Sequence, residues 1–468
     1  MKRLVISSDP FVVKAALIEN GKLATLVIKR KTYSNDAVVG NVYKGIIKDV
    51  VPNIGAAFVE IGLDKKAFMC IDSHCIDNIR SNGINIKEGE EVLVQVYKPI
   101  VSSKGAKVTP NITIAGNYLV LLRNSNFIGV SKHIEDKAKS KWLRNFLSNL
   151  REDNIGFIAR TASRFAAEDE LVREAEYLKS INREISQKFA TAKAPALIYE
   201  EPQLPIRVIR EYCDYTTDEI VFDDADVYKK TKDYLNITSN RCADRVALYE
   251  GDKPIFEYFG IMDEIKNLQS NVVHLKSGGY LIIEKTEAFF AIDVNSGSYH
   301  YHTDEPEESI FRINLEAAYE IFKQINLRDL GGLIIVDFID MSSKEHIERL
   351  QDVLFKLAKN DKRKTYVSKM SELGVIEISR RKSNTDIFDE MFDKCPDCYN
   401  GGLVKSIPLV CSEIYEKIKY SNKKRFRLKA PLSVVEHFKA YMPNWNKHIE
   451  FITTHSCNVE DYTLEVLP

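Results

Sequence analysis

The sequence predicts a multidomain α/β (α+β) protein. Its 468 residues are enough for about three or four domains. Hydrophobic residues make up 44% and charged residues 28% of the chain, which is ordinary for folded domains with large cores. Residues 37–122 show short β-rich runs separated by Gly, Pro and Asn, whereas residues 276–393 alternate strand-like runs with amphipathic helices. These patterns indicate a strand-rich module followed by an α/β layer.

Residues 1–36 contain three predicted strands: Lys2–Ser7, Val12–Glu19 and Leu23–Lys29. The turn signal at Glu19-Asn20-Gly21 joins the second strand to the third. Three such strands are too small a unit to be stable alone, so we expect later strands to complete their sheet. Residues 205–275 are the candidate partners, because they mix short strands, such as Ile206–Arg210, with helical segments.

Residues 37–122 read as five short strands, which suggests a small OB-type barrel. Phe58 and Phe68 lie on successive strands, with lysines nearby at positions 44, 48, 65, 66 and 104. Aromatic rings among lysines form a stacking platform for single-stranded nucleic acid. The alternative interpretation places both rings in the barrel core.

Residues 123–204 combine a strand at Phe157–Arg160 with a long amphipathic helix at about 166–190. Between them lies Arg160-Thr161-Ala162-Ser163. A guanidinium and two hydroxyls at a turn suit a phosphate group. The alternative is an exposed loop in which Ser163 caps the helix.

Residues 276–393 contain three apolar runs that we interpret as strands buried on both faces: Tyr280–Glu284, Phe289–Ile292 and Leu333–Val336. Asp293 and Asp337 each follow directly after such a run. Two acids at the ends of neighbouring strands suit Mg2+, which takes oxygen ligands and usually only one or two protein carboxylates. Asn295 points to the same side of the chain as Asp293. Alternatively, both aspartates simply end strands as turn-formers.

Two amphipathic helices complete this α/β layer. The first spans Glu307–Asn326 and leads into the strand at 333. The second spans Ser343–Asn360 and is expected to begin with a capping box between Ser342 and Glu345.

Cys395 and Cys398 form a Cys-x-x-Cys pair within residues 394–405. Such a pair supplies half of a tetrahedral zinc site, and the simplest completion is the same pair from a second copy of the chain. A redox pair, or ligation by Cys411, Cys457 or a histidine, is the alternative. The six other cysteines are expected to be small buried hydrophobes.

Residues 406–468 read as a small α/β domain with a helix at Leu409–Lys419 and a strand at Glu450–Thr454. The formal net charge of −1 requires any polyanion site to be local. No window approaches the roughly 18 apolar residues of a membrane span, and the N-terminus lacks a signal-peptide core, so a cytoplasmic location is expected.

The motifs taken together resemble the ribonuclease E/G family. They are, in order, GNVYKGIIKDVVPNIGAAFVEIG, SKGAKVTPNITIAGNYLVLL, GFIARTAS, GGYLIIEKTEAFFAIDVNSGS, NLEAAYEIFKQINLRDLGGLIIVDFIDM and CPDC. The resemblance implies a ribonuclease H-like domain (1–36 and 205–275) interrupted by an OB-fold RNA-binding domain (37–122) and a 5′-sensor region (123–204), then a DNase I-like catalytic domain (276–393), a zinc link (394–405) and a small C-terminal domain (406–468).

The resemblance also implies roles for individual residues. Asp293 and Asp337 match the family's metal-binding carboxylates, and Asn295 matches their catalytic helper. The residues with which the family's OB domain binds RNA correspond to Phe58, Phe68 and Lys104. The pocket for a 5′-monophosphate corresponds to Gly116, Val120, Arg160 and Thr161.

Two positions depart from the family pattern. Lys364 stands where the family pocket has an arginine. A lysine keeps the positive charge but lacks the planar guanidinium group that can form two parallel hydrogen bonds. Cys395 and Cys398 match a zinc link between protomers of a homodimer or homotetramer. Asn400 replaces the first glycine of that motif, and Asn tolerates the left-handed conformation.

By this resemblance the chain is expected to be a Mg2+-dependent endoribonuclease. It would cleave single-stranded, A/U-rich RNA, with stimulation by a 5′-monophosphate, in rRNA and tRNA processing and mRNA decay. It is expected to need no small-molecule cofactor. The alternative is a non-catalytic RNA-binding protein that uses the OB-fold domain, which explains the aromatic and basic residues but not the two carboxylates.

Overall fold

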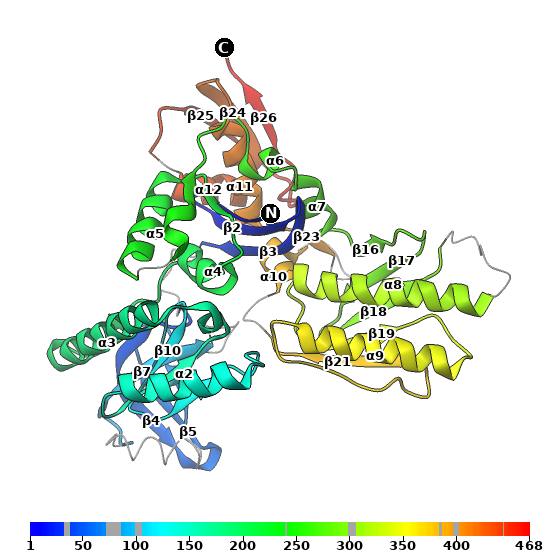
Figure 1. The fold of residues 1–468 in the computed structure, drawn as a ribbon. Helices are drawn as coiled ribbons and strands as arrows, with labels where there is room; N and C mark the ends of the chain where they lie inside the picture. Colours follow the sequence, from blue (N-terminus) through cyan, green and yellow to red (C-terminus); the bar gives the residue numbers. More distant parts are fainter. Residues whose placement is uncertain are drawn as a thin grey trace. The chain divides into compact units, whose positions relative to one another are not determined.

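The computed structural model describes residues 1–31, 38–71, 86–98, 105–238, 241–297, 306–382, 386–395, 402–442 and 444–468 (Figure 1). The chain forms two compact units. One comprises Met1–Lys31, Val221–Asp224 and Leu248–Pro468, and the other comprises Thr32–Ile220 and Ala225–Ala247. In the described part of the chain, no helix is both long and apolar enough to cross a membrane.

The N-terminal strands belong to a five-stranded sheet with the order β15-β14-β1-β2-β3. Its strands are β1 (Lys2–Ser8), β2 (Val12–Glu19), β3 (Lys22–Arg30), β14 (Glu219–Phe222) and β15 (Val246–Leu248). The two late strands supply the partners that the first three require. Ile206–Arg210 is not a strand: it lies inside helix α4 (Leu204–Tyr212), where Pro205 favours the first turn of a helix.

Five strands close into a barrel, as the sequence predicts. They are β4 (Val42–Val51), β5 (Ala56–Glu60), β6 (Ala67–Cys70), β7 (Glu91–Lys98) and β8 (Lys107–Thr109). They follow the order β4-β5-β6-β8-β7, and β4 also pairs with β7, which closes this OB-like barrel. A short strand, β13 (Ala196–Tyr199), pairs with β4 from outside.

A four-stranded sheet of order β11-β12-β10-β9 follows the barrel. Its strands are β9 (Thr113–Ala115), β10 (Leu119–Arg123), β11 (Ile128–Val130) and β12 (Ile155–Ala159), and helices α2 (Lys137–Leu150) and α3 (Glu168–Thr191) share its core. β9 and β10 fall within the range expected for the barrel but pair here instead. Ser163 does not cap α3; it lies in a 3-10 turn, and its hydroxyl donates to the carbonyl of Tyr118.

The α/β layer is a six-stranded sheet of order β16-β17-β18-β19-β21-β20. Its elements are β16 (Val272–His274), β17 (Tyr280–Lys285), β18 (Phe289–Asn295), α8 (Pro306–Leu327), β19 (Gly332–Asp337), α9 (Lys344–Asn360), β20 (Thr365–Val367) and β21 (Val375–Arg380). Helices α8 and α9 lie side by side across it (Figure 1). The cap of α9 is Ser343 rather than Ser342, because the Ser343 hydroxyl accepts from the His346 amide.

The strands of this sheet are buried on one face only, so the expectation of burial on both faces is wrong. Ile292 and Val294 are buried, whereas Asp293 between them is exposed. Val336 is likewise buried next to an exposed Asp337. The alternation leaves an open face on which both aspartates lie.

The C-terminal region pairs β24 (Arg425–Pro431) with β25 (His448–Thr454) and β26 (Thr463–Val466). Helices α11 (Ile407–Lys419) and α12 (Leu432–Tyr441) pack on Phe11 and Val12 of the N-terminal region. The remaining elements are α5 (Ala225–Ile237), α6 (Ile255–Tyr258), α7 (Met262–Asn267), α10 (Ile387–Met391), β22 (Phe392–Lys394), β23 (Leu403–Lys405) and the 3-10 turns at Pro52–Ile54, Thr161–Phe165 and Arg241–Arg245.

The cysteines depart in part from expectation. Cys213 and Cys242 form a disulfide, so they are not free buried thiols. Cys411 is a buried free cysteine, as expected, whereas Cys457 is exposed.

Candidate active site

Asp293 and Asp337 are neighbours on adjacent strands. β18 and β19 run parallel, because helix α8 connects them, and Asp293 is in register with Asp337. Both side chains are exposed on the open face of the sheet. Residues 44 positions apart in the chain are therefore brought together at the carboxyl ends of the two strands.

Asn295 lies on the same face, two residues after Asp293. Its Nδ2 donates to Oδ2 of Asp293 at 2.8 Å. This hydrogen bond fixes the orientation of the Asp293 carboxylate, so the three residues singled out from the sequence form one cluster.

The electrostatics of this cluster favour a bound cation. Partial burial raises the pKa of Asp337, and the negative charges of Asp293 and Asp340 raise it further. No group of three or more His, Cys, Asp or Glu side chains converges as a metal site in the described part of the chain. An oxygen-only set with two carboxylates fits Mg2+, which keeps several waters, better than it fits zinc.

The segment after Asp337 is held by helix α8. Asn314 is fully buried; its Nδ2 donates to the carbonyl of Ile339 at 2.7 Å, and its Oδ1 accepts from the Ile339 amide at 3.1 Å. Glu307 of the same helix accepts from the amides of Ser342 and Ser343. Asn314 was not singled out from the sequence. It could have been found as a polar residue beside Ile313 and Ala317 on the apolar face of the helix.

We expect Asn314→Ala to destabilise the protein by about 2–4 kcal/mol, because it leaves two partly buried backbone groups of Ile339 unpaired. Urea unfolding measures this difference. Asn360→Ala is the matched control, since Asn360 is exposed at the end of α9. Equal stability of the two variants would show that the hydrogen bonds from Asn314 to Ile339 do not stabilise the fold.

Phe58 and Phe68 lie on the outer face of the barrel. They are paired across β5 and β6, with ring centroids 6.0 Å apart and planes at 81°. Both are half-buried, while their strand neighbours Ala57, Val59 and Met69 fill the core. The interpretation that places both rings in the barrel core is therefore wrong.

The lysines near these rings differ from expectation. Lys44 is buried, pairs with Glu91 and donates to the carbonyls of Phe189 and Ala192, so it does not contribute to a basic surface. Lys104 lies outside the described residues. The lysine over the Phe68 ring is Lys107, with Nζ at 5.4 Å from the centroid. The parallel pairing of β6 with β8 places it there, which the sequence alone does not reveal.

Arg160 and Gly116 meet at one end of the four-stranded sheet, directly after β12 and β9. Nη1 of Arg160 donates to the carbonyl of Gly116, and a side chain on Gly116 would collide with the Glu174 carboxylate. Burial lowers the pKa of Arg160, and the charge of Arg210 lowers it further. Thr161 is exposed, with its hydroxyl 2.9 Å from that of Ser131.

The other predicted phosphate ligands are spread more widely. Val120 is half-buried on β10, opposite Ile158 of β12. Lys364 is exposed in the other compact unit, between α9 and β20. The structure thus brings Gly116, Arg160 and Thr161 to one end of the sheet, and it does not place Lys364 relative to them.

Cys395 follows β22 directly, and its amide donates to the carbonyl of Gly402 at 2.7 Å. This bond closes the hairpin of β22 and β23. Cys398 and Asn400 lie outside the described residues, so the expected zinc link stays a prediction.

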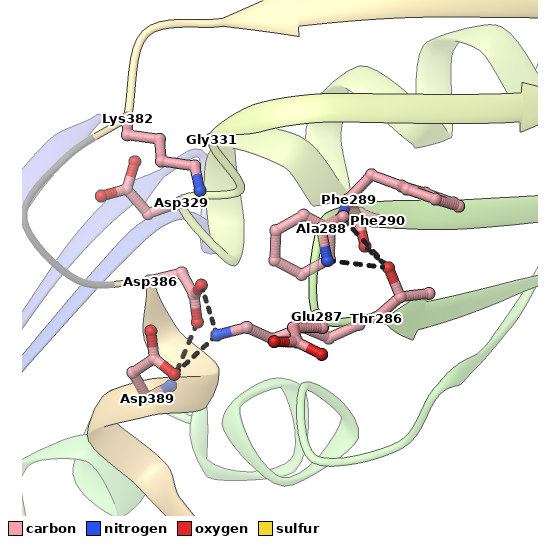
Figure 2. Close-up of a pocket in the computed structure, with 11 residues that line it drawn as sticks. Thr286, Glu287, Ala288, Phe289, Phe290, Asp329, Gly331, Lys382, Asp386 and Asp389 are labelled. Carbon is pink, nitrogen blue, oxygen red and sulfur yellow. Dashed lines mark hydrogen bonds and ion pairs between the residues drawn. The ribbon is translucent and has the colours of Figure 1, made fainter.

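A polar pocket of about 140 Å³ lies at the opposite end of β18 and β19 from the aspartates (Figure 2). Several of its charged groups are already paired. Lys285 contacts Asp386 at 2.8 Å and Asp389 at 2.6 Å. Asp329 is bound by Arg363 and Arg380. This pocket is therefore a weaker candidate for catalysis than the Asp293–Asp337 pair.

Comparisons with known proteins agree with the geometry. Residues 113–383 match the sequence profile described as the Ribonuclease E/G family. The chain is 35% identical to a ribonuclease G of Haemophilus influenzae and 33% identical to one of Escherichia coli, over 89% of this chain and 86% and 87% of those proteins. It is 32% identical to a ribonuclease E of H. influenzae, over 86% of this chain and 44% of that protein.

The fold, the site and these relatives define an endoribonuclease. More narrowly, the chain belongs to the ribonuclease E/G family.

Proposed function

We propose that this endoribonuclease is Mg2+-dependent and cleaves single-stranded, A/U-rich RNA, with stimulation by a 5′-monophosphate. Its proposed roles are rRNA and tRNA processing and mRNA decay, in the cytoplasm. The observation that carries the proposal is the pairing of Asp293 with Asp337 on adjacent parallel strands, with Asn295 bonded to Asp293.

Asp293 and Asp337 are the residues that would hold Mg2+. When bound there, Mg2+ would activate a water molecule and neutralise negative charge on the scissile phosphate. Asn295 keeps the Asp293 carboxylate in one orientation. Both carboxylates are exposed on the open face of the sheet, where we propose that an extended strand of RNA binds. The proposed hydrolysis leaves a 5′-phosphate and a 3′-hydroxyl.

The outer barrel face is the proposed platform for the bases. Phe58 and Phe68 offer an aromatic pair, and Lys107 adds a positive charge over the Phe68 ring. Thr161, with Arg160 and Gly116 beside it, is the proposed site for a 5′-monophosphate.

We expect Phe58→Ala to weaken the binding of single-stranded RNA about tenfold, because one stacked base is worth about 1–3 kcal/mol. Fluorescence anisotropy with a labelled A/U-rich oligomer measures the change. Phe127→Ala is the control, since Phe127 is exposed in the same compact unit but away from the barrel strands. If the two variants bind RNA equally well, Phe58 does not stack on a base of the RNA.

The proposal extends to a zinc ion shared between protomers of a homodimer or homotetramer, through Cys395 and Cys398. We expect Cys395→Ser to lose bound zinc and to shift the protein toward monomer in sedimentation velocity. Cys457→Ser is the control, because Cys457 is an exposed cysteine elsewhere in the chain. An unchanged oligomeric state in Cys395→Ser would refute the shared ion.

The central test uses one RNA sequence with two different 5′ ends. A labelled, 5′-monophosphorylated A/U-rich oligomer is incubated with the protein and Mg2+, with and without EDTA, beside its 5′-hydroxyl counterpart. We expect internal cleavage that EDTA abolishes and that the 5′-monophosphate accelerates. Cleavage that persists in EDTA would refute the metal dependence.

A further inference from the structure

The open face of the six-stranded sheet carries more than the two aspartates. Helices α8 and α9 lie across its opposite face (Figure 1). On the open face, Leu333 of β19 is 40% exposed and Tyr366 of β20 is 69% exposed. A single exposed hydrophobic side chain is ordinary, but several that lie together point to a contact with a ligand.

Strand pairing places these side chains in one row. Leu333 is in register with Ser379 of β21, and Ser379 is in register with Tyr366. On its other side Leu333 is in register with the half-buried Phe289 of β18. Residues in register on neighbouring strands point to the same face of a sheet. Val367, next to Tyr366, is buried in the core, so the row lies on the open face.

The row lies close to the proposed catalytic site. Leu333 and Asp337 are four residues apart on β19, which corresponds to about 13 Å at about 3.3 Å per residue. A stacked strand of nucleic acid covers this distance with about four nucleotides, and a more extended strand needs fewer. Glu377 of β21 lies between the row and the aspartates. Its carboxylate favours a neutral base over a phosphate at that position.

Two cations follow the row on the side away from the aspartates. The Arg381 amide donates to the Lys364 carbonyl at 3.0 Å, which extends the pairing of β20 with β21 by one residue. Arg381 is two residues after Ser379, so it lies on the same face. Lys364 is two residues before Tyr366 and lies there too. Both are exposed, so a phosphate that follows the row would meet positive charge.

We propose that this row is a second contact site for the RNA, in which the Tyr366 ring stacks on a base within about four nucleotides of the scissile phosphate. The inference rests on the proposed function, because the same RNA strand must also reach Asp293 and Asp337. Sheets that bind single-stranded RNA use exposed aromatic rings in this way. Arg381 and Lys364 contact the neighbouring phosphates. The site raises RNA affinity and takes no part in the cleavage step.

The first test measures cleavage of a labelled RNA with one cleavage site. Tyr366→Ala removes the ring, and Tyr366→Thr removes it while keeping the β-strand propensity. Tyr319→Ala is the matched control, because Tyr319 is 54% exposed on α8, on the helix side of the same sheet. We expect both Tyr366 variants to raise KM about tenfold with kcat within about twofold, and the control to change neither. Equal KM values for the Tyr366 variants and the control would overturn the proposal.

The second test maps the contact along the RNA. In a series of the same RNA, one nucleotide at a time lacks its base, over about four positions on either side of the cleavage site. At one position, loss of the base should raise KM about tenfold for the unmodified protein and for Tyr319→Ala. The same change should have no further effect in the Tyr366 variants. If every abasic RNA affects the unmodified protein and the Tyr366 variants equally, the ring does not stack on a base.

Fluorescence anisotropy in EDTA separates this proposal from the proposed function. The Tyr366 variants should bind the RNA about tenfold more weakly than Tyr319→Ala does. Arg381→Gln should reduce the slope of log affinity against log salt concentration by about one. Thermal unfolding checks that the variants fold.

Two outcomes divide the proposals. If the Tyr366 variants bind weakly but the unmodified protein does not cleave RNA with Mg2+, the contact site stands and the proposed reaction fails. If the unmodified protein cleaves RNA but Tyr366→Ala and Tyr319→Ala bind it equally well, the contact site alone is refuted.

Discussion

Asp337→Asn should lower the rate of RNA cleavage about a thousandfold while RNA affinity stays within about twofold. The substitution keeps the shape of the side chain and removes one of two negative charges that hold the cation. Metal-based stabilisation of the transition state is worth several kcal/mol, and each 1.4 kcal/mol is a factor of ten in rate. Asp293→Asn should have the same effect, because the two carboxylates are in register on β18 and β19. Single-turnover cleavage with saturating protein measures the chemical step apart from binding.

The matched control for these variants is Glu377→Gln. Glu377 is an exposed carboxylate on β21 and pairs with Ile335 of β19, two residues before Asp337. It therefore carries the same charge change on the same sheet. The Asp337→Asn protein should be no less stable than the parent, because Asp293 and Asp340 repel the Asp337 carboxylate. Cleavage within about tenfold of the parent in both aspartate variants would refute the metal assignment.

The pairing of Asp293 with Asp337 could be predicted, because it depends on the local sequence pattern around each residue. Each aspartate follows an apolar strand, and a strand–helix–strand connection makes the strands parallel, so their ends meet. The prediction of burial on both faces failed at Asp293 and Asp337, because both helices pack against one side of the sheet. A continuous apolar run does not reveal whether a second layer covers its other face.

Contacts between distant segments were harder to predict. Lys44 and Lys107 look alike in sequence, yet one is buried against Phe189 and the other lies over Phe68. The difference arises from strand pairing across the barrel. Ile206–Arg210 is apolar enough for a strand, but burial at Val208 and Ile209 follows a helical face. Such outcomes are decided by tertiary packing rather than by local propensity.

The largest loss of stability is expected from Arg380→Met. Arg380 is 3% exposed, and its Nε donates to Oδ2 of Asp361 at 2.7 Å. It also donates to Asn326, Asp329 and the carbonyl of Leu330. Its removal leaves the Asp361 carboxylate buried without a cation, which costs about 3–5 kcal/mol. Urea unfolding at pH 7 measures the loss, and Arg381→Met is the control at the exposed neighbouring residue.

The pH dependence of unfolding tests the same ion pair. Burial alone would raise the pKa of Asp361, but hydrogen bonds from Arg380 and Thr365 and the charge of Arg380 outweigh it and hold the pKa below its ordinary value. A depressed carboxyl pKa adds stability that is fully present above the unfolded pKa of about 3.9 and is lost as the pH falls through the lower folded value. Arg380→Met should therefore lose part of this acid dependence. The double variant Arg380→Met/Asp361→Leu should recover most of the stability at pH 7, because no charge stays buried unpaired. If the double variant is as unstable as Arg380→Met, the loss comes from the contacts with Asn326, Asp329 and Leu330 rather than from the ion pair.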